Sequence, residues 1–278
     1  MKSRLLPALV GLMTTIAMVT VGGGMTDVAM ASSSPTRLSD SAVAAYKAQH
    51  DTKAAYVRAV AAAYARHNAQ KRAKYGSRSA TAARSANVAA APLSVVSGSG
   101  WAYLSPLNQQ GEQRSYWCGP ATVSMVAWTV PGPSNVNQST AASWMGTNTS
   151  GTSEGQETSG LNHFVGVPDY GWSFYGFVSM NGNPTSSQRA TFLSDLKIDV
   201  SLNSPVAGDA WEVVGGPHLV GHPNQQIFHW FEIGGWNTNN GKSYYADPAT
   251  SVWSTVPPYS WFSTYTMETI LGGRGYAW

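Results

Sequence analysis

The 278-residue chain carries a formal net charge of +3, and 43% of its residues are hydrophobic. This length is enough for one domain of about 150–200 residues with additional segments, and such a domain buries a sizeable core. After residue 31 no segment is apolar for long enough to cross a bilayer, which excludes transmembrane helices from that part of the chain.

Residues 1–31 have the pattern of a secretory signal peptide. Two basic residues precede an apolar run over residues 5–21, and AMA at residues 29–31 supplies the small side chains that a signal peptidase reads. The alternative is a membrane anchor, but the apolar run is short, contains three threonines and ends in a glycine triplet. We therefore expect secretion, with a mature chain that begins near residue 32.

The composition changes abruptly near residue 100. Residues 32–100 contain ten Lys or Arg residues against Asp40 and Asp51, a formal charge of +8. Residues 101–278 contain five basic and eleven acidic residues, a formal charge of −6, and all eleven tryptophans. Two regions with such different chemistry are not expected to share a core, and the acidic region is not expected to bind nucleic acid.

The composition of the alanine-rich basic segment, residues 32–75, predicts a helix over residues 41–75, with Ser39 and Asp40 available as caps. Residues 76–100 are rich in Ser, Ala and Gly and predict a linker to the domain at residues 101–278. Opposite charges favour a pro-region that associates with the acidic domain and is later removed. The alternative is a basic arm that lies on anionic cell wall or lipid.

The domain itself has the pattern of an α+β fold. Helical patterns come mainly early and strand patterns mainly late, an order that favours α+β over repeated βαβ units. Residue 183 is available as a cap for the last helix, with Pro184 in its first turn. We expect strands at residues 101–104, 172–180, 205–214, 227–236 and 243–246, and helices at residues 118–128, 140–145, 159–164 and 185–202.

Cys118 is the single cysteine of the chain. In an exported protein an unpaired cysteine is either part of an intermolecular disulfide or reactive, although a buried inert thiol is also common. Pro120 is tolerated only in the first turn of a helix, so Cys118 should lie at a helix N-terminus. The backbone N–H groups and the helix dipole favour the thiolate there. The helix would be held by a buried stripe of Val123, Val126 and Ala127.

A nucleophilic thiolate needs a base and a group that orients the base. His218 and His222 lie among Gly and Pro residues that predict a flexible loop, whereas His229 begins a strand pattern. A strand holds an imidazole more rigidly, so we expect His229 to be the base. If the strands pair as a hairpin through residues 237–241, Asp247 returns to within a pair or two of His229. The alternative is that Asp247 and Pro248 only start a turn, which is the commoner role of an Asp-Pro pair.

These segments resemble the papain-like cysteine peptidases related to the bacteriocin-leader-processing enzymes. The motifs are CGPAT after an aromatic residue, then HWFEIGG, then a strand that closes in ADP, and the similarity covers residues 104–278. The resemblance implies a papain-like fold in which a helical part carries Cys118 and an antiparallel sheet carries His229 and Asp247. It implies Cys118 as nucleophile, His229 as general base and acid, and Asp247 as orienting group.

The same family uses a glutamine upstream of the cysteine as an oxyanion-hole donor beside the cysteine N–H. The resemblance therefore implies a glutamine in this role, although none here has the spacing expected of the family. We expect Gln110, which directly follows the apolar strand, with Gln113 second and Gln109 as the other candidate. This chain contains neither the membrane spans nor the ATPase of the transporter-linked members, so it is similar to the stand-alone secreted type. Cleavage after a double-glycine leader is not carried over.

We therefore expect a secreted cysteine peptidase that acts on a peptide or protein substrate. The alternatives are an amidase or transpeptidase for cell-wall peptides with the same triad, and a non-catalytic module that binds glycans with its tryptophans. Specificity should come from loops such as residues 146–158, and the pocket from Trp117, Trp230 and Trp236. No cofactor or metal is expected, since one Cys and scattered His residues lack zinc-ligand spacing.

Overall fold

The computed structural model describes residues 94–130, 135–171 and 173–278. The expected signal peptide, the basic segment and most of the expected linker lie outside these residues, so their structure and removal stay predictions. Among the described residues, no helix combines the length and the apolar character that crossing a membrane requires.

The described residues form an eight-stranded sheet in which every strand pair is antiparallel. The longest strand, β5, pairs with β2, β4 and β6 and therefore lies at the centre of the sheet. The strands are β1 (Ser94–Gly98), β2 (Trp101–Ser105), β3 (Phe177–Ser179), β4 (Val206–Glu212), β5 (Ile227–Asn237), β6 (Lys242–Ala246), β7 (Tyr259–Ser263) and β8 (Gly275–Ala277).

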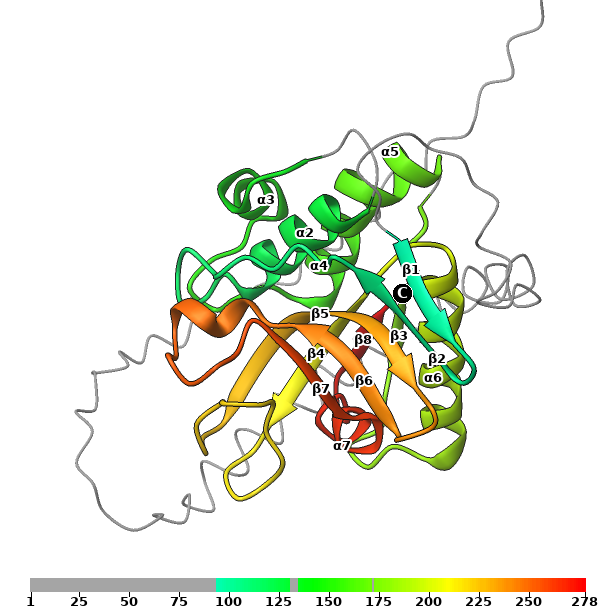
Figure 1. The fold of residues 1–278 in the computed structure, drawn as a ribbon. Coiled ribbons are helices and arrows are strands. Elements are labelled where there is room, and N and C mark those ends of the chain that lie inside the picture. The colour runs from blue at the N-terminus through cyan, green and yellow to red at the C-terminus, as the bar shows by residue number, and fades with distance from the viewer. Residues whose placement is uncertain (1–93, 131–134, 172) are drawn as a thin grey trace, which may run out of the picture. The chain divides into compact units, whose positions relative to one another are not determined.

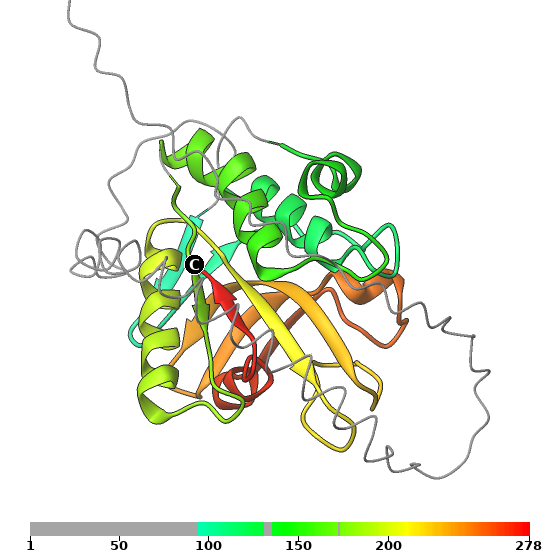
Figure 2. The same ribbon diagram turned by 180° about the vertical axis from the view of Figure 1, so that it is seen from behind.

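The helices fall into separate groups around this sheet (Figures 1 and 2). The first group, α2 to α5, gathers on one side, where α2 contacts α3, α4 and β5; α6 packs on β5 and β2, and α7 on β4, β6 and β7. They are α2 (Cys118–Thr129), α3 (Gln138–Met145), α4 (Glu154–Leu161), the π-helix η2 (Asn162–Gly166), α5 (Val167–Tyr170), α6 (Ser186–Ser201), the 3₁₀ helix η3 (Pro248–Ser251) and α7 (Thr264–Ile270). This antiparallel sheet with segregated helices is the expected α+β arrangement.

Helix α2 is the central helix of the fold. Pro120 fits its first turn, where a missing N–H costs no hydrogen bond, and the helix ends at Thr129. Apart from Cys118 and Trp128 all its residues are buried, and the expected stripe of Val123, Val126 and Ala127 lies fully in the core. The rigid packing of α2 therefore fixes the position of Cys118 at its first residue.

Four expectations about element boundaries need correction. Of the expected strand over residues 172–180, strand β3 covers only Phe177–Ser179. The last part of the expected linker, Ser94–Gly98, is strand β1, which pairs along its whole length with β2. The expected helix over residues 159–164 is instead the run α4, η2 and α5 over residues 154–170. Helix α6 is capped by Thr185, whose side chain forms a capping box with Gln188, and not by residue 183.

The negative charge of the domain does not form an acidic surface. Of its eleven acidic residues, all but Asp169 are buried. Burial also raises the pKa of Glu157 and raises that of Glu232 to about 8, and Asp209 pairs with Arg274, so the formal charge overstates the negative field that could attract a basic segment. Association of residues 32–75 with this domain therefore stays a prediction, and the expected electrostatic attraction gives it little support.

The core position of β5 predicts different costs for two phenylalanines of the same strand. Phe231 is fully buried, so Phe231→Ala should lower the free energy of unfolding by about 3–5 kcal/mol. Phe228 is 46% exposed, so Phe228→Ala should cost less than about 1 kcal/mol. Urea unfolding of the full chain followed by tryptophan fluorescence measures both. Equal costs would contradict the described packing of β5.

Candidate active site

Cys118 is a half-buried free thiol at the start of α2. Within the described residues no side chain caps this helix, so the N–H groups of its first turn face the space around the sulfur. A Cβ on Gly119 would lie 2.5 Å from Thr152 Oγ1, which means that the loop before α4 packs directly on the helix start. The sulfur is therefore held in a fixed place at the N-terminus of α2.

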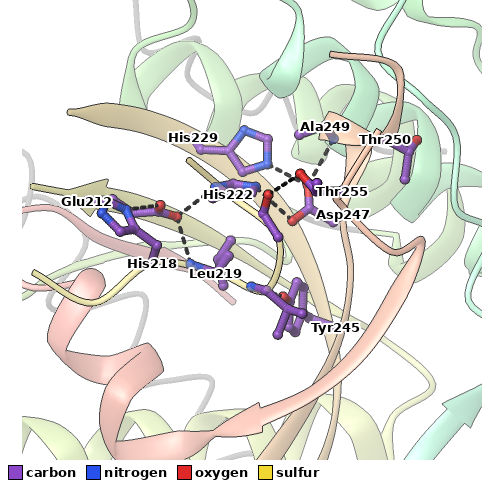
Figure 3. Close-up of polar contacts among 12 residues, drawn as sticks. Glu212, His218, Leu219, His222, His229, Tyr245, Asp247, Ala249, Thr250 and Thr255 are labelled. Atoms are coloured by element: carbon purple, nitrogen blue, oxygen red, sulfur yellow. Dashed lines mark hydrogen bonds and ion pairs between the residues drawn. The ribbon is translucent and has the colours of Figure 1, made fainter. Parts of the chain in front are cut away.

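His229 lies on β5 and is 3% exposed. Its Nε2 is 3.0 Å from Asp247 Oδ1 (Figure 3). Cys118 also interacts with the ring, and because Nε2 is bound to Asp247, Nδ1 is the ring nitrogen that remains for the sulfur. Burial disfavours the charged ring, but the Asp247 carboxylate and the hydrogen bonds to Asp247 and Cys118 outweigh it. The pKa of His229 therefore lies well above its usual value.

Asp247 is fully buried at the end of β6, where it also caps η3 through a 2.9 Å hydrogen bond from Ala249 N–H to Oδ1. The hairpin expected from the sequence forms, because Glu232 pairs with Ala246 and residue 247 follows directly. Burial alone would raise the pKa of Asp247, but His229 and the hydrogen bonds from two histidines lower it well below its usual range. Asp247 is therefore a carboxylate at neutral pH.

The second histidine at Asp247 is His222, which the sequence analysis placed in a flexible loop. Its Nε2 lies 3.1 Å from Asp247 Oδ2, and its Nδ1 lies 2.9 Å from Glu212 Oε1. The contact between His222 and Glu212 is an ion pair, and Glu212 Oε2 accepts a hydrogen bond from His218 Nδ1 at 2.8 Å (Figure 3). Three histidines and two carboxylates thus form one connected network, whereas the sequence pattern pointed to a single His–Asp pair.

The expected oxyanion-hole glutamines do not gather at the start of α2. Gln110 Oε1 accepts a hydrogen bond from Ser124 Oγ, six residues along α2 and so about 9 Å from its start. Gln109 Nε2 donates to Asp247 O and to Thr250 Oγ1, and Gln113 is an exposed residue. The role of Gln110 stays a prediction, and the position of its side chain argues against it.

Glu112 is the polar side chain that lies near the triad residues instead. It is 7% exposed, interacts electrostatically with His229 and Asp247, and accepts a hydrogen bond from the backbone of Trp117. Its Oε2 is buried and has no hydrogen-bond partner among the described residues. Burial raises the pKa of Glu112 above its usual value, although His229 and the Trp117 backbone act in the opposite direction. The sequence pattern did not indicate Glu112, since the oxyanion-hole donor expected from the resemblance is a glutamine amide.

A pocket of about 510 Å³ opens beside Cys118. Its walls include Trp211, Phe228, Trp230 and Arg274, together with loop residues 148–153. Part of the loop expected to carry specificity therefore lines the pocket. Of the three expected tryptophans only Trp230 does so: Trp117 stacks with Arg114 and Trp236 with Lys197.

Several buried ionisable side chains lie next to the pocket. Arg274 pairs with Asp209, lies 4.0 Å from Glu154 and packs over the Phe228 ring at 4.9 Å. Glu157 is fully buried next to Cys118, and burial followed by the nearby negative charges holds its pKa well above the usual value. In its protonated form Glu157 adds no negative charge beside Cys118.

Ligand atoms of His222, His229 and Asp247 lie within 4.8 Å of one another, a spacing that a metal ion could use. The hydrogen bonds of the network already occupy both Asp247 oxygens and the Nε2 atoms of the two histidines. The arrangement is therefore complete as a hydrogen-bonded network, and we assign no metal to it.

Two comparisons with known proteins found similarity. The model of the Peptidase_C39 like family matches residues 103–268, which is more than half of the chain. Among solved structures, the peptidase domain of Streptococcus ComA, a bi-functional ABC transporter involved in a quorum-sensing pathway, matches at 14% sequence identity with a TM-score of 0.40. That match covers 62% of this chain and 96% of the ComA domain.

No curated protein matches the chain. The family match confirms both the resemblance inferred from CGPAT, HWFEIGG and ADP and the expected papain-like α+β fold. The chain belongs to the Peptidase_C39 like family and is a cysteine peptidase.

Proposed function

We propose that this protein is a secreted peptidase that hydrolyses peptide bonds with a Cys118–His229–Asp247 triad. The observation that carries the proposal is that the buried His229 ring lies between two groups: Asp247, whose Oδ1 is 3.0 Å from Nε2, and Cys118, whose interaction with the ring raises the pKa of His229. Nucleophile, base and orienting group thus have the relation that acyl transfer requires. Export rests on the signal-peptide pattern of residues 1–31.

In the first step the Cys118 thiolate attacks the substrate carbonyl carbon, a C–S bond forms, and the carbonyl electron pair moves to oxygen. Collapse of this intermediate breaks the C–N bond while the His229 imidazolium donates its proton to the leaving nitrogen. Neutral His229 then takes a proton from water, whose oxygen attacks the thioester carbon. Cleavage of the C–S bond restores the thiolate and the imidazolium, with Asp247 holding the ring throughout.

The oxyanion needs donors near the sulfur. One is the backbone N–H of Cys118 at the uncapped start of α2. For the second we propose the carboxyl group of Glu112, which in its protonated form has an O–H to donate. A buried carboxylic acid with a raised pKa acts in this way in other enzymes. Ionised Glu112 would instead repel the oxyanion, so activity should require the neutral acid.

The triad predicts which residues cleavage depends on. The full chain should cleave members of a mixed peptide library, whereas Cys118→Ala should abolish cleavage because the nucleophile is lost. Asp247→Asn should lower kcat by roughly 10²–10⁴-fold through loss of His229 orientation and charge.

Mass spectrometry in ¹⁸O-labelled water detects the products, and circular dichroism verifies that each variant is folded. Hydrolysis puts one ¹⁸O atom into the new carboxyl terminus, whereas transfer to an added amine forms an unlabelled amide. Undiminished cleavage by Cys118→Ala would refute the proposed triad. Amide products alone would point to a transpeptidase.

The Glu112 assignment predicts a specific pH dependence. Activity of the wild-type protein should fall as pH rises through the raised pKa of Glu112, which starts from a usual value of 4.5. Glu112→Gln keeps a donor at every pH, so its kcat/KM relative to wild type should increase with pH. Glu112→Ala should lose roughly 10²–10³-fold in kcat.

Gln110→Ala is the matched control, since its side chain is bound to Ser124. Its kcat should stay within about 3-fold of wild type, a change far below the loss of an oxyanion donor. A loss of activity in Gln110→Ala with a normal Glu112→Ala variant would return the donor role to Gln110.

A further inference from the structure

We propose that His222 and Glu212 are positioning residues of this active site. They hold the second oxygen of Asp247 and limit how strongly that carboxylate stabilises a protonated His229. The inference rests on the proposed triad and extends it by two residues, neither of which contacts Cys118 or substrate in the proposed mechanism.

Asp247 is shared between two histidines (Figure 3). Oδ1 accepts from His229 Nε2 at 3.0 Å and Oδ2 accepts from His222 Nε2 at 3.1 Å. With Ala249 N–H also bound to Oδ1, the carboxylate is held from three directions and cannot rotate about its χ2 angle without breaking a hydrogen bond. The direction in which Asp247 faces His229 is therefore set partly by His222.

The surroundings of His222 favour its charged form. A neutral imidazole has one donor and one acceptor nitrogen, so a neutral His222 would turn a lone pair toward Glu212 or Asp247. Both carboxylates raise the pKa of His222, although burial and the nearby His229 act against them. Glu112 also interacts with His222 electrostatically, and the uncharged Trp253 ring packs 4.9 Å from it.

Glu212 is fixed by its own contacts. It is fully buried at the end of β4, and Leu219 N–H donates to its Oε1 at 3.2 Å while His218 Nδ1 binds its Oε2 at 2.8 Å. The loop that carries His222 is held as well. Gly221 has φ +82°, a Cβ there would collide with the Thr255 backbone, and Thr255 Oγ1 donates to Gly221 O at 2.6 Å. The loop therefore presents His222 in one place.

The His222 ring lies close enough to His229 to affect its proton transfer. The two ring centroids are 5.1 Å apart, so a positively charged His222 partly neutralises the Asp247 carboxylate and repels a positively charged His229. His229 then releases its proton to the leaving nitrogen more readily than it would if Asp247 were bound to His229 alone. His222 keeps its own proton, and Glu212 keeps His222 charged.

A double-mutant cycle of His222→Gln and Glu212→Gln in the full chain tests the inference. The His222→Gln side chain keeps an amide that can donate to Asp247 but carries no charge, so the pKa of His229 should rise. The alkaline limb of the pH profile for Cys118 alkylation, which reports the loss of the proton from His229, should therefore move to higher pH. Glu212→Gln should move the limb in the same direction, because His222 then loses the partner that keeps it charged. The double variant should match His222→Gln, and kcat should fall about 10-fold with KM within about 2-fold.

His163→Gln is the control, since His163 stacks on Trp144 outside the network and should leave the limb unmoved. A merely structural role would lower the melting temperatures of the two variants additively without moving the limb, and that result would overturn the inference. A downward shift in Glu212→Gln would also overturn it, since Glu212 would then act on His229 directly. If His222→Gln does not fold, the direction of the Glu212→Gln shift alone decides. A wild-type protein without a His229-dependent profile would refute the triad itself.

Discussion

The site depends on one buried interaction, the contact between the Asp247 carboxylate and the His229 ring. A carboxylate is costly to bury unless charged partners and hydrogen bonds compensate it, and Asp247 has both. The central strand β5 supplies His229, the neighbouring strand β6 ends at Asp247, and the packed helix α2 brings Cys118 to the other side of the ring. Each element of the fold therefore contributes one part of a geometry that none of them could produce alone.

Most acidic side chains of the domain are buried. Those near the site have different protonation states because their neighbours differ. Asp247 is ionised by its histidines, whereas Glu157, beside the same thiol but without a cation that lowers its pKa, is held neutral by burial. The ionised Asp247 therefore lies beside His229, and the protonated Glu157 lies beside Cys118 at the start of α2. In the proposed mechanism this separation allows one site to hold both a thiolate and an imidazolium.

Local patterns in the sequence were sufficient for the parts of the site that lie on regular elements. Pro120 marked the start of α2, and counting around the β5–β6 turn brought Asp247 to His229. The contribution of His222 could not be predicted, because its position depends on tertiary contacts of a loop with Glu212 and Thr255. The proposed role of Glu112 could not be predicted either, because a carboxyl group serves as a donor only when burial raises its pKa, and burial is a property of the fold. Strands β7 and β8 and helix α7 were missed as well, since their short segments lack a clear period.

The most direct measurement is the rate of Cys118 alkylation by iodoacetamide between about pH 4 and pH 9, for the full chain and for His229→Ala. Since the chain has one cysteine, the modification reports on this site alone. The account predicts a rate that persists well below pH 8.5, where a free thiol is mostly protonated, and that is lost or shifted in the variant. A rate that rises only above about pH 8 and is the same in both proteins would mean an ordinary thiol, and it would contradict the proposed triad.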